Sequence, residues 1–136
     1  MANTLKLEIV TPEAKTFSED VEMVTLPAME GEMGIYPMHV PLMTQIVAGE
    51  VSVIKGGQQH FFAVGDGFVE ITGGRVAILT DMAVNADDID EAKAEEARKR
   101  AETRLQEKLS EEEMATVTAA LAHSLAQLQV KRRRRQ

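Results

Sequence analysis

Two carboxylates and an imidazole lie close together in the sequence, as Glu30, Glu32 and His39. Such a set can transfer protons or contribute ligands to a metal ion. One loop histidine, however, lacks the second or third ligand that a metal site needs, and glutamates on both sides of Gly31 are typical of a solvated turn. The pattern therefore favours a loop, and an enzyme that acts on a small substrate through these three side chains is kept as an alternative.

Established catalytic motifs are absent from the sequence. It contains no G-x-S-x-G, P-loop or H-E-x-x-H pattern, and its short Gly-rich pairs do not make a dinucleotide fingerprint. Because the chain has 0 Cys, a thiol nucleophile, a disulfide scaffold and a Cys-ligated metal are excluded. We therefore expect a non-catalytic protein with no cofactor or metal of its own.

The strongest charge signal lies at the C-terminus, where five cations are adjacent: Lys131, Arg132, Arg133, Arg134 and Arg135. Such a run can pair with phosphates, with anionic lipid or with an acidic protein surface. No aromatic residue interleaves with the arginines and the rest of the chain is acidic, so an acidic protein partner is favoured over nucleic acid. A sandwich adaptor that binds nucleic acid or anionic lipid through this tail is the alternative, and a solvated terminus is the simplest interpretation.

The chain divides in composition near residue 86. Residues 1–86 contain 4 Lys/Arg and 11 Asp/Glu, whereas residues 87–136 contain 11 of each. All 4 Phe, the single Tyr, all 9 Gly and all 4 Pro also lie before residue 87. This break predicts two domains, at 1–86 and 87–136.

No apolar run approaches the ~20 residues of a membrane-spanning helix, and the N-terminus lacks the features of a signal peptide. We therefore expect no direct membrane insertion, and a cytosolic chain unless a partner holds it at a membrane.

The first part has the pattern of antiparallel strands. Residues 5–9 alternate between apolar and polar side chains, and 49–54 with 60–64 and 68–72 with 75–79 form two hairpin patterns with Gly-rich turns. Residues 21–26 change parity, which indicates a bulge or a strand buried on both faces. Residues 26–42 contain three prolines and two glycines, and we expect them to be mostly loop. Short strands at this spacing predict a sandwich or a flattened barrel.

The second part has the period of two helices. Asp88 and Glu91 are spaced as a capping box for the first helix, whose apolar stripe consists mostly of Ala. Ser110 and Glu113 repeat that signal for a second helix, with an apolar stripe at Met114, Val117, Leu121, Leu125 and Leu128. We expect a hairpin with a very short turn, marginally stable alone, whose second helix continues into the basic tail.

These residues resemble the ε subunit family of F-type ATP synthases, called δ in mitochondria. Residues 30–42 match the loop pattern E-G-E-[LM]-G-I-x-P-x-H-x-P-L at every fixed position. Residues 66–71 resemble a G-G-x-x-E-V strand, and residues 89–94 resemble the I/L-D-x-x-R-A start of the first C-terminal helix. The resemblance covers the whole chain. It implies an α+β fold, mainly β, with an antiparallel ten-stranded β-sandwich followed by an antiparallel two-helix hairpin.

The resemblance also implies a function. Such proteins are non-catalytic central-stalk rotor subunits that couple proton-driven rotation of the c ring through γ to ATP synthesis, at the cytoplasmic face of the plasma membrane. It assigns Glu32, Tyr36 and His39 to the contact with the c ring and γ. It also implies that the helices can extend into the catalytic head of α and β subunits and inhibit ATP hydrolysis, with the cations from Lys131 to Arg135 on an acidic segment.

Some relatives bind ATP as a regulatory ligand on the hairpin. The resemblance carries that role to Asp90 and Lys93, although Lys93 stands where arginine is usual and lacks its planar fork. No Lys or Arg occurs between Lys108 and Lys131, so phosphate donors are missing from most of the second helix. Asp90 has a simpler interpretation as a first-turn acid on the helix dipole.

Overall fold

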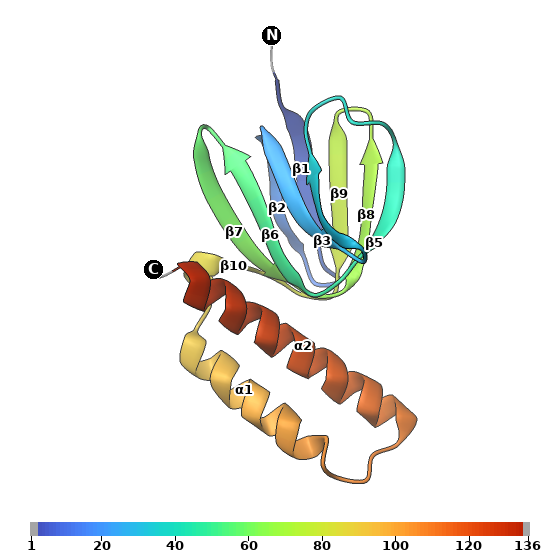
Figure 1. Ribbon diagram of the computed structural model, residues 1–136, viewed down its shortest axis with the longest axis vertical. Helices are drawn as coiled ribbons and strands as arrows, with labels where there is room; N and C mark the ends of the chain where they lie inside the picture. Colours follow the sequence, from blue (N-terminus) through green and yellow to red (C-terminus); the bar gives the residue numbers. More distant parts are fainter. Residues whose placement is uncertain (1–2, 135–136) are drawn as a thin grey trace.

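The computed structural model describes residues 3–134. Ten strands come first and the helices follow, so that the sandwich stands above a helical hairpin in Figure 1. The strands are β1 (Leu5–Val10), β2 (Lys15–Val21), β3 (Met23–Ala28), β4 (Gly31–Ile35), β5 (Leu42–Ile46), β6 (Gly49–Lys55), β7 (Gln58–Val64), β8 (Gly67–Thr72), β9 (Arg75–Thr80) and β10 (Ala83–Asn85). A 3-10 turn, η1 (Ala86–Asp88), precedes the helices α1 (Glu91–Arg104) and α2 (Glu111–Arg134).

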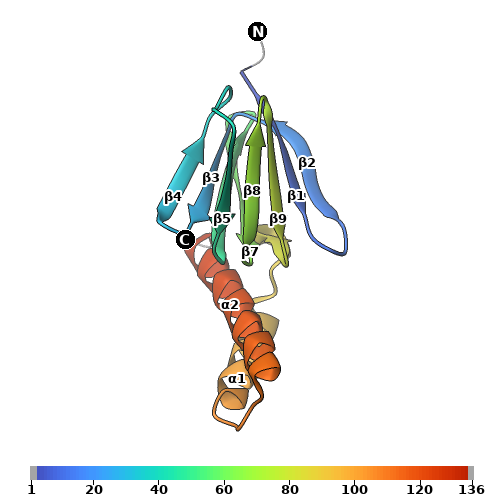
Figure 2. The ribbon, with the colours of Figure 1, turned by 90° about the vertical axis from the view of Figure 1, so that its right-hand side faces the viewer.

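The strands form one continuous sheet in the order β10-β7-β6-β3-β5-β8-β9-β1-β2, with β4 paired to β3. β3 and β5 share only the pair Ala28 and Ile46, so the sheet folds over there into two layers (Figures 1 and 2). The predicted mainly β fold with ten strands and a helical hairpin is confirmed. One detail of the antiparallel prediction is wrong, because β1 and β9 pair in parallel. They are joined by sheet pairing but lie far apart in sequence, so no hairpin constrains their direction.

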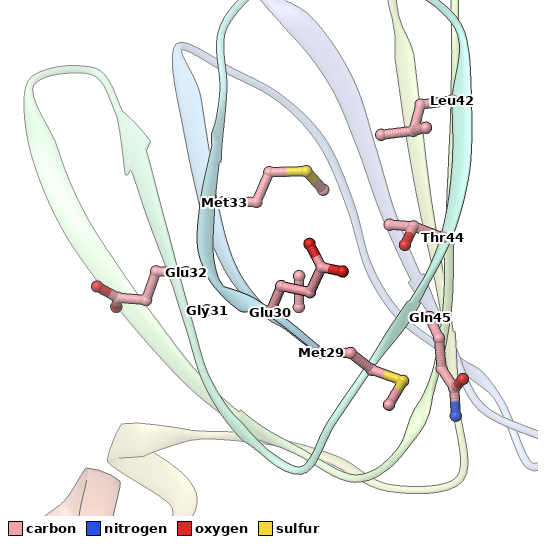
Figure 3. Close-up of a pocket in the computed structure, with 9 residues that line it drawn as sticks. Met29, Glu30, Gly31, Glu32, Met33, Leu42, Thr44 and Gln45 are labelled. Carbon is pink, nitrogen blue, oxygen red and sulfur yellow. The ribbon is translucent and has the colours of Figure 1, made fainter.

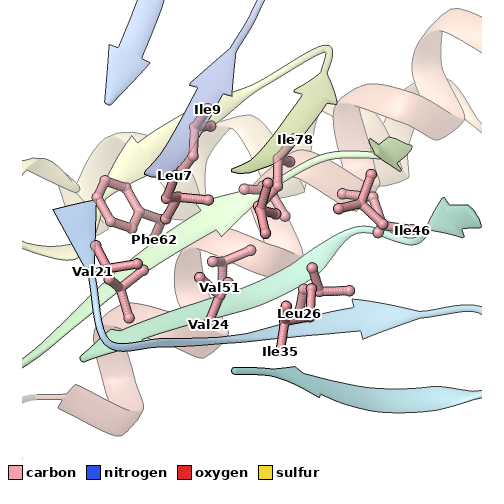
Figure 4. Packing of buried hydrophobic residues seen from close by; sticks show 14 of the residues in the cluster. Leu7, Ile9, Val21, Val24, Leu26, Ile35, Ile46, Val51, Phe62 and Ile78 are labelled. Carbon is pink, nitrogen blue, oxygen red and sulfur yellow. The ribbon is translucent and has the colours of Figure 1, made fainter. Parts of the chain in front are cut away.

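The core lies between the two layers and is built from alternate positions of the strands, as Figure 4 shows. Phe17 and Phe62 meet edge to face with ring centroids 5.2 Å apart. The change of parity at residues 21–26 is not a bulge. β2 ends at Val21 and β3 begins at Met23, and the corner at Glu22 lets Val21 and Val24 both face the core.

The prediction that residues 26–42 are mostly loop is wrong for the first half of this segment. β3 runs through Pro27, which lies opposite Glu32 of β4. The carbonyl of Pro27 points away from β4 and accepts a hydrogen bond from Val47 N at 2.8 Å. Its missing N–H faces the same way, so proline does not prevent β3 from pairing with β4. Gly31, at φ 126°, opens β4 after the turn. Only residues 36–41, which contain the other two prolines, form an irregular connection.

Glu8 is a charged residue of β1 that is almost covered, with 5% of its surface exposed. Lys15 Nζ lies 2.6 Å from its carboxylate and Arg75 pairs with the other oxygen. The hydrogen bond from Lys15, together with the charges of Arg75 and Lys15, lowers the pKa of Glu8 below its ordinary 4.5 despite desolvation. Ion pairs from Lys15 of β2 and Arg75 of β9 therefore connect both neighbouring strands to β1.

The helix boundaries follow their capping residues. The N-cap of α1 is Asp90, whose carboxylate accepts from Lys93 N at 3.1 Å, so the predicted cap at Asp88 is wrong and Asp88 ends η1. The second capping box is confirmed, since Ser110 N donates to Glu113 Oε1 and Glu113 N donates to Ser110 Oγ, each at 3.1 Å. Residues 105–110 connect the helices, a longer turn than predicted.

α2 lies between the sandwich and α1 (Figure 1) and contacts β6, β7 and η1. It therefore buries two faces rather than one stripe: Val117, Ser124 and Leu128 are buried, as are Ala126 and Val130 of the sandwich cluster. Met114 and Leu125 of the predicted stripe are instead 39% and 48% exposed. None of the described helices is long and apolar enough to cross a membrane.

Candidate functional site

The connection between β4 and β5 forms an exposed tip at the end of the sandwich remote from the helices, in cyan in Figures 1 and 2. Tyr36 is 62% exposed and Met38 is 93% exposed. Met38 adopts φ 66°, a conformation that is strained for a side chain of this size. His39 Nδ1 lies 2.7 Å from the Val40 carbonyl oxygen, which fixes the ring against its own loop. Apolar side chains are thus held outward on a constrained loop, as in a docking surface.

Glu32 lies elsewhere. It is the second residue of β4, ~13 Å along the strand from Tyr36 at ~3.3 Å per residue. Glu32 and Glu30 line a groove between β4 and β5, and Figure 3 shows the Glu30 carboxylate and the Met33 side chain pointing into the groove while the Glu32 side chain points away from it. The structure therefore brings Tyr36 and His39 together but leaves Glu32 at the other end of β4.

The positions of Glu30, Glu32 and His39 test the alternative that they form the site of an enzyme. His39 lines a separate depression with Asn3, Thr4 and the β8–β9 turn, and it does not line the groove that contains the two glutamates. Among residues 3–134 no group of three or more His, Cys, Asp or Glu side chains is arranged to hold a metal ion. Glu30, Glu32 and His39 thus do not converge on one substrate-sized site.

A second exposed surface was missed by the sequence reasoning. Met43, Phe68 and Leu79 are 63%, 53% and 47% exposed on the outer face of β5, β8 and β9. Phe68 lies directly opposite Leu79, and Met43 is two residues from Gln45, which faces Phe68. We call these three residues the outer apolar patch. The available signal was that these strands carry apolar residues at both parities, so one set must lie outside the core.

The basic tail continues α2, as predicted, up to Arg134, and Arg135 lies outside the described residues. Its cations have partners within the chain that sequence reasoning did not find. Arg132 donates to Glu91 Oε2 and Glu95 Oε2, both at 2.9 Å, on α1. These hydrogen bonds raise the pKa of Arg132, with Glu91 the larger cause, so the group is permanently charged.

The remaining cations reach the sandwich. Lys131 Nζ donates to the Ala86 carbonyl oxygen at 3.2 Å. Arg134 donates twice to Glu50 of β6, through Nε at 3.2 Å and Nη2 at 3.0 Å, and Arg133 Nη1 lies 3.5 Å from the same carboxylate. With Arg134 also over the Phe61 ring of β7, the described part of the tail contacts four elements that precede α2: β6, β7, η1 and α1.

Asp90 and Lys93 are placed at the start of α1. Asp90 is occupied as the N-cap, and Lys93 is exposed. The nearby arginines are already paired with acids: Arg98 and Arg132 both bond Glu95, and with Arg98 as the first cause they lower the pKa of that carboxyl. The arginines that could donate hydrogen bonds to a phosphate at this end of the hairpin are therefore already paired with carboxylates.

Comparison with known proteins gives consistent matches over nearly the whole chain. Residues 4–86 match the family model described as the beta-sandwich domain of the ATP synthase Delta/Epsilon chain, and residues 87–132 match its long alpha-helix domain. The chain is 43% identical over 131 residues to the ATP synthase epsilon chain of Herpetosiphon aurantiacus, covering 96% of each. It is 46% identical over 126 residues to that of Chloroflexus aggregans, covering 93% of this chain and 91% of the relative.

Solved structures share the fold. A chain of the Euglena gracilis mitochondrial ATP synthase superposes with a TM-score of 0.74 at 24% identity, over 93% of this chain and 80% of the other. A chain of the central stalk and c ring of the Tetrahymena thermophila mitochondrial ATP synthase gives a TM-score of 0.65 at 10% identity, over 93% and 95%. At these identities the likeness concerns the architecture of sandwich and hairpin.

Proposed function

The chain belongs to the ATP synthase delta/epsilon family, and on that basis we propose that it is the non-catalytic rotor subunit of the central stalk of an F-type ATP synthase. In this role it couples proton-driven rotation of the c ring through γ to ATP synthesis. The observation that carries the proposal is the match of both parts of the chain, in order and over 96% of its length, to an ATP synthase epsilon chain.

The sandwich supplies the surfaces for coupling. A rotor part must transmit torque, and a closely packed core of interdigitated side chains deforms little under load. The tip with Tyr36 and His39 lies at the end of the sandwich remote from α2 and is open to a partner. Glu32 lies at the other end of β4, exposed on the edge that no described strand pairs with, and offers a second contact for the c ring and γ. The outer apolar patch offers γ a surface from which water can be displaced.

The hairpin supplies regulation. Its helices inhibit ATP hydrolysis when they leave the sandwich and extend into the catalytic head of α and β subunits, where the basic tail from Lys131 to Arg135 meets an acidic surface. The structure described above is the docked state, in which α2 lies under the sandwich. Inhibition then depends on the free-energy difference between docked and extended states.

Nucleotide contact at Asp90 and Lys93 belongs to the same proposal as a regulatory detail. A triphosphate there has to compete with Glu91 and Glu95 for Arg132, so we expect weak binding. Calorimetric titration of the isolated chain with ATP checks this, with Lys93→Ala as the variant that removes the contact.

The proposed location is the cytoplasmic face of the plasma membrane, where the chain is peripheral and is held through γ and the c ring. The alternative function, an adaptor that binds nucleic acid or anionic lipid through the tail, predicts affinity of the isolated chain for polyanions that falls steeply with salt. The family match favours the rotor subunit over this adaptor.

Reconstitution tests the proposed function. Membranes depleted of this subunit are supplied with the wild-type chain or with Phe68→Ser, and proton-driven ATP synthesis is measured. We expect the wild-type chain to restore synthesis and Phe68→Ser to restore it poorly, since a serine removes apolar contact from the outer apolar patch. Met114→Ser, an apolar loss of similar kind on α2, is the matched control. Failure of the wild-type chain to restore synthesis would contradict the proposal.

A further inference from the structure

The last turn of α2 contacts β7 through Arg134 and η1 through Lys131, under the sandwich in Figure 1. This end of the helix is the most basic segment of the chain, and its charges complement the negative end of the helix dipole. Every described cation of the turn has an acceptor within the protein. A solvated terminus would not make such contacts. The arrangement therefore suggests that this turn stabilises the docked position of α2.

Glu50 of β6 is the central acceptor. Its side chain is only 11% exposed, and it accepts two hydrogen bonds from one guanidinium, at 3.2 Å and 3.0 Å from Arg134. This paired geometry is the strongest that an arginine and a carboxylate adopt. When α2 moves away, Glu50 and Arg134 exchange these two charge-assisted hydrogen bonds for contacts with water. Undocking is therefore opposed by the net free energy of the paired contact.

The same guanidinium makes a second contact with the sandwich. Arg134 Cζ lies 3.7 Å from the centre of the Phe61 ring on β7, within range for a cation–π interaction. Lys131, one turn earlier, donates to the Ala86 carbonyl oxygen of η1. The basic end of α2 therefore binds the sandwich through a carboxylate, an aromatic face and a backbone oxygen, on three separate elements.

The apolar part of the docking interface is small by comparison. Its buried cluster has mostly short side chains, namely Ala63, Ala86, Ile89, Ala126 and Val130, and the partly buried Phe61, Met82 and Val84 pack against it. Alanines bury little area, so hydrophobic burial alone gives the docked state a modest advantage. The polar contacts at the helix end therefore add to a modest apolar interface in holding α2 in place.

We infer that the basic end of α2 is an intramolecular latch, in which Arg134, supported by Arg133 and Lys131, holds the hairpin on the sandwich through Glu50 and Phe61. While Arg134 is bound to Glu50 it is unavailable to any external acidic surface. The two uses of the tail therefore exclude each other, and the Arg134–Glu50 contact must break before the tail reaches a partner. The latch itself is a property of the isolated chain and goes beyond the proposed function.

Amide hydrogen exchange of α2 in the isolated full-length chain tests the latch. Glu50→Gln removes the acceptor charge but leaves the whole basic tail intact, and we expect exchange between residues 117 and 130 to accelerate about ten- to a hundredfold. Asp20→Asn, which removes the same charge from an exposed position on β2, is the control and leaves exchange unchanged. Equal exchange in Glu50→Gln and wild-type chains, with the sandwich verified as folded by its own protected amides, overturns the latch.

A double-mutant cycle shows whether the pair acts directly. Arg134→Gln alone accelerates exchange as Glu50→Gln does, and the combined variant exchanges no faster than the single variants, because each has already removed the same contact. Raised salt also accelerates amide exchange of α2 in the wild-type chain, because it screens the ion pair, and it accelerates exchange less in either variant. Additive effects of the two substitutions contradict a direct Arg134–Glu50 latch.

Discussion

Val130→Ala should release the hairpin without weakening the sandwich. Val130 has 0% of its surface exposed and belongs to the small cluster between α2 and the sandwich, separate from the main core. Loss of two methyl groups at ~0.8 kcal/mol each, with a residual cavity, costs about 1.5–2.5 kcal/mol of docking free energy. At ~1.4 kcal/mol per tenfold, the ratio of docked to extended chains falls about ten- to seventyfold. Alanine also favours helix, so α2 itself is not destabilised.

The assay is the distribution of distances between two spin labels. Because the chain has 0 Cys, cysteines introduced at Lys6 on β1 and Gln129 on α2 are the sole labelling sites. Leu125→Ala, on the same helix but 48% exposed, is the matched control and should change docking free energy by less than about 0.5 kcal/mol. Identical distance distributions for the two variants would refute the assignment of Val130 to a docking interface.

Three further changes test other parts of the structure. Glu32→Gln should lower the yield of ATP synthesised per proton translocated in reconstituted membranes, with the melting temperature unchanged; a lower melting temperature with normal coupling would make Glu32 structural. Glu8, whose pKa is lowered in the folded state, stabilises the fold above its unfolded pKa and loses that effect as pH falls through the folded value. The melting temperature of Glu8→Gln should therefore fall less than that of wild type between about pH 6 and about pH 3; an equal fall contradicts this. Gly67→Ala places a Cβ against the backbone of β9 and should cost about 2 kcal/mol or more in urea unfolding, whereas Gly74→Ala has open space and should be near neutral.

The sequence predicted those features that depend on neighbours along the chain. Alternation located most strands, and the capping pair of Ser110 and Glu113 set the start of α2. It failed at residues 31–35, because proline and glycine counts do not reveal that β3 can accept a partner along the side that Pro27 does not block. It also misplaced the first cap, because Asp88 is taken up by the 3-10 turn η1 and Asp90, two residues later, is the N-cap of α1.

The candidate site was predictable only in part. Tyr36 and His39 share a short loop, so their proximity follows from the chain itself. The separation of Glu32 from them depends on β4 being extended, which was not predicted. The partners of the tail could not be deduced at all, because Glu50 and Arg134 are 84 residues apart and meet only when α2 docks. The exposure of Leu125 has the same origin, since α2 shares its surface between α1 and the sandwich.

The assignment to the central stalk is tested most directly by isolating the chain with its partners. An affinity-tagged copy is produced in its own cells and recovered from detergent-solubilised membranes at physiological salt, and the proteins that accompany it are identified and quantified. A rotor subunit should bring α, β, γ and c subunits in the proportions of an intact ATP synthase, with ATP hydrolysis activity in the same fraction. Recovery of the chain without γ and c subunits, from membranes in which the intact enzyme is shown to be present, would contradict the proposed function.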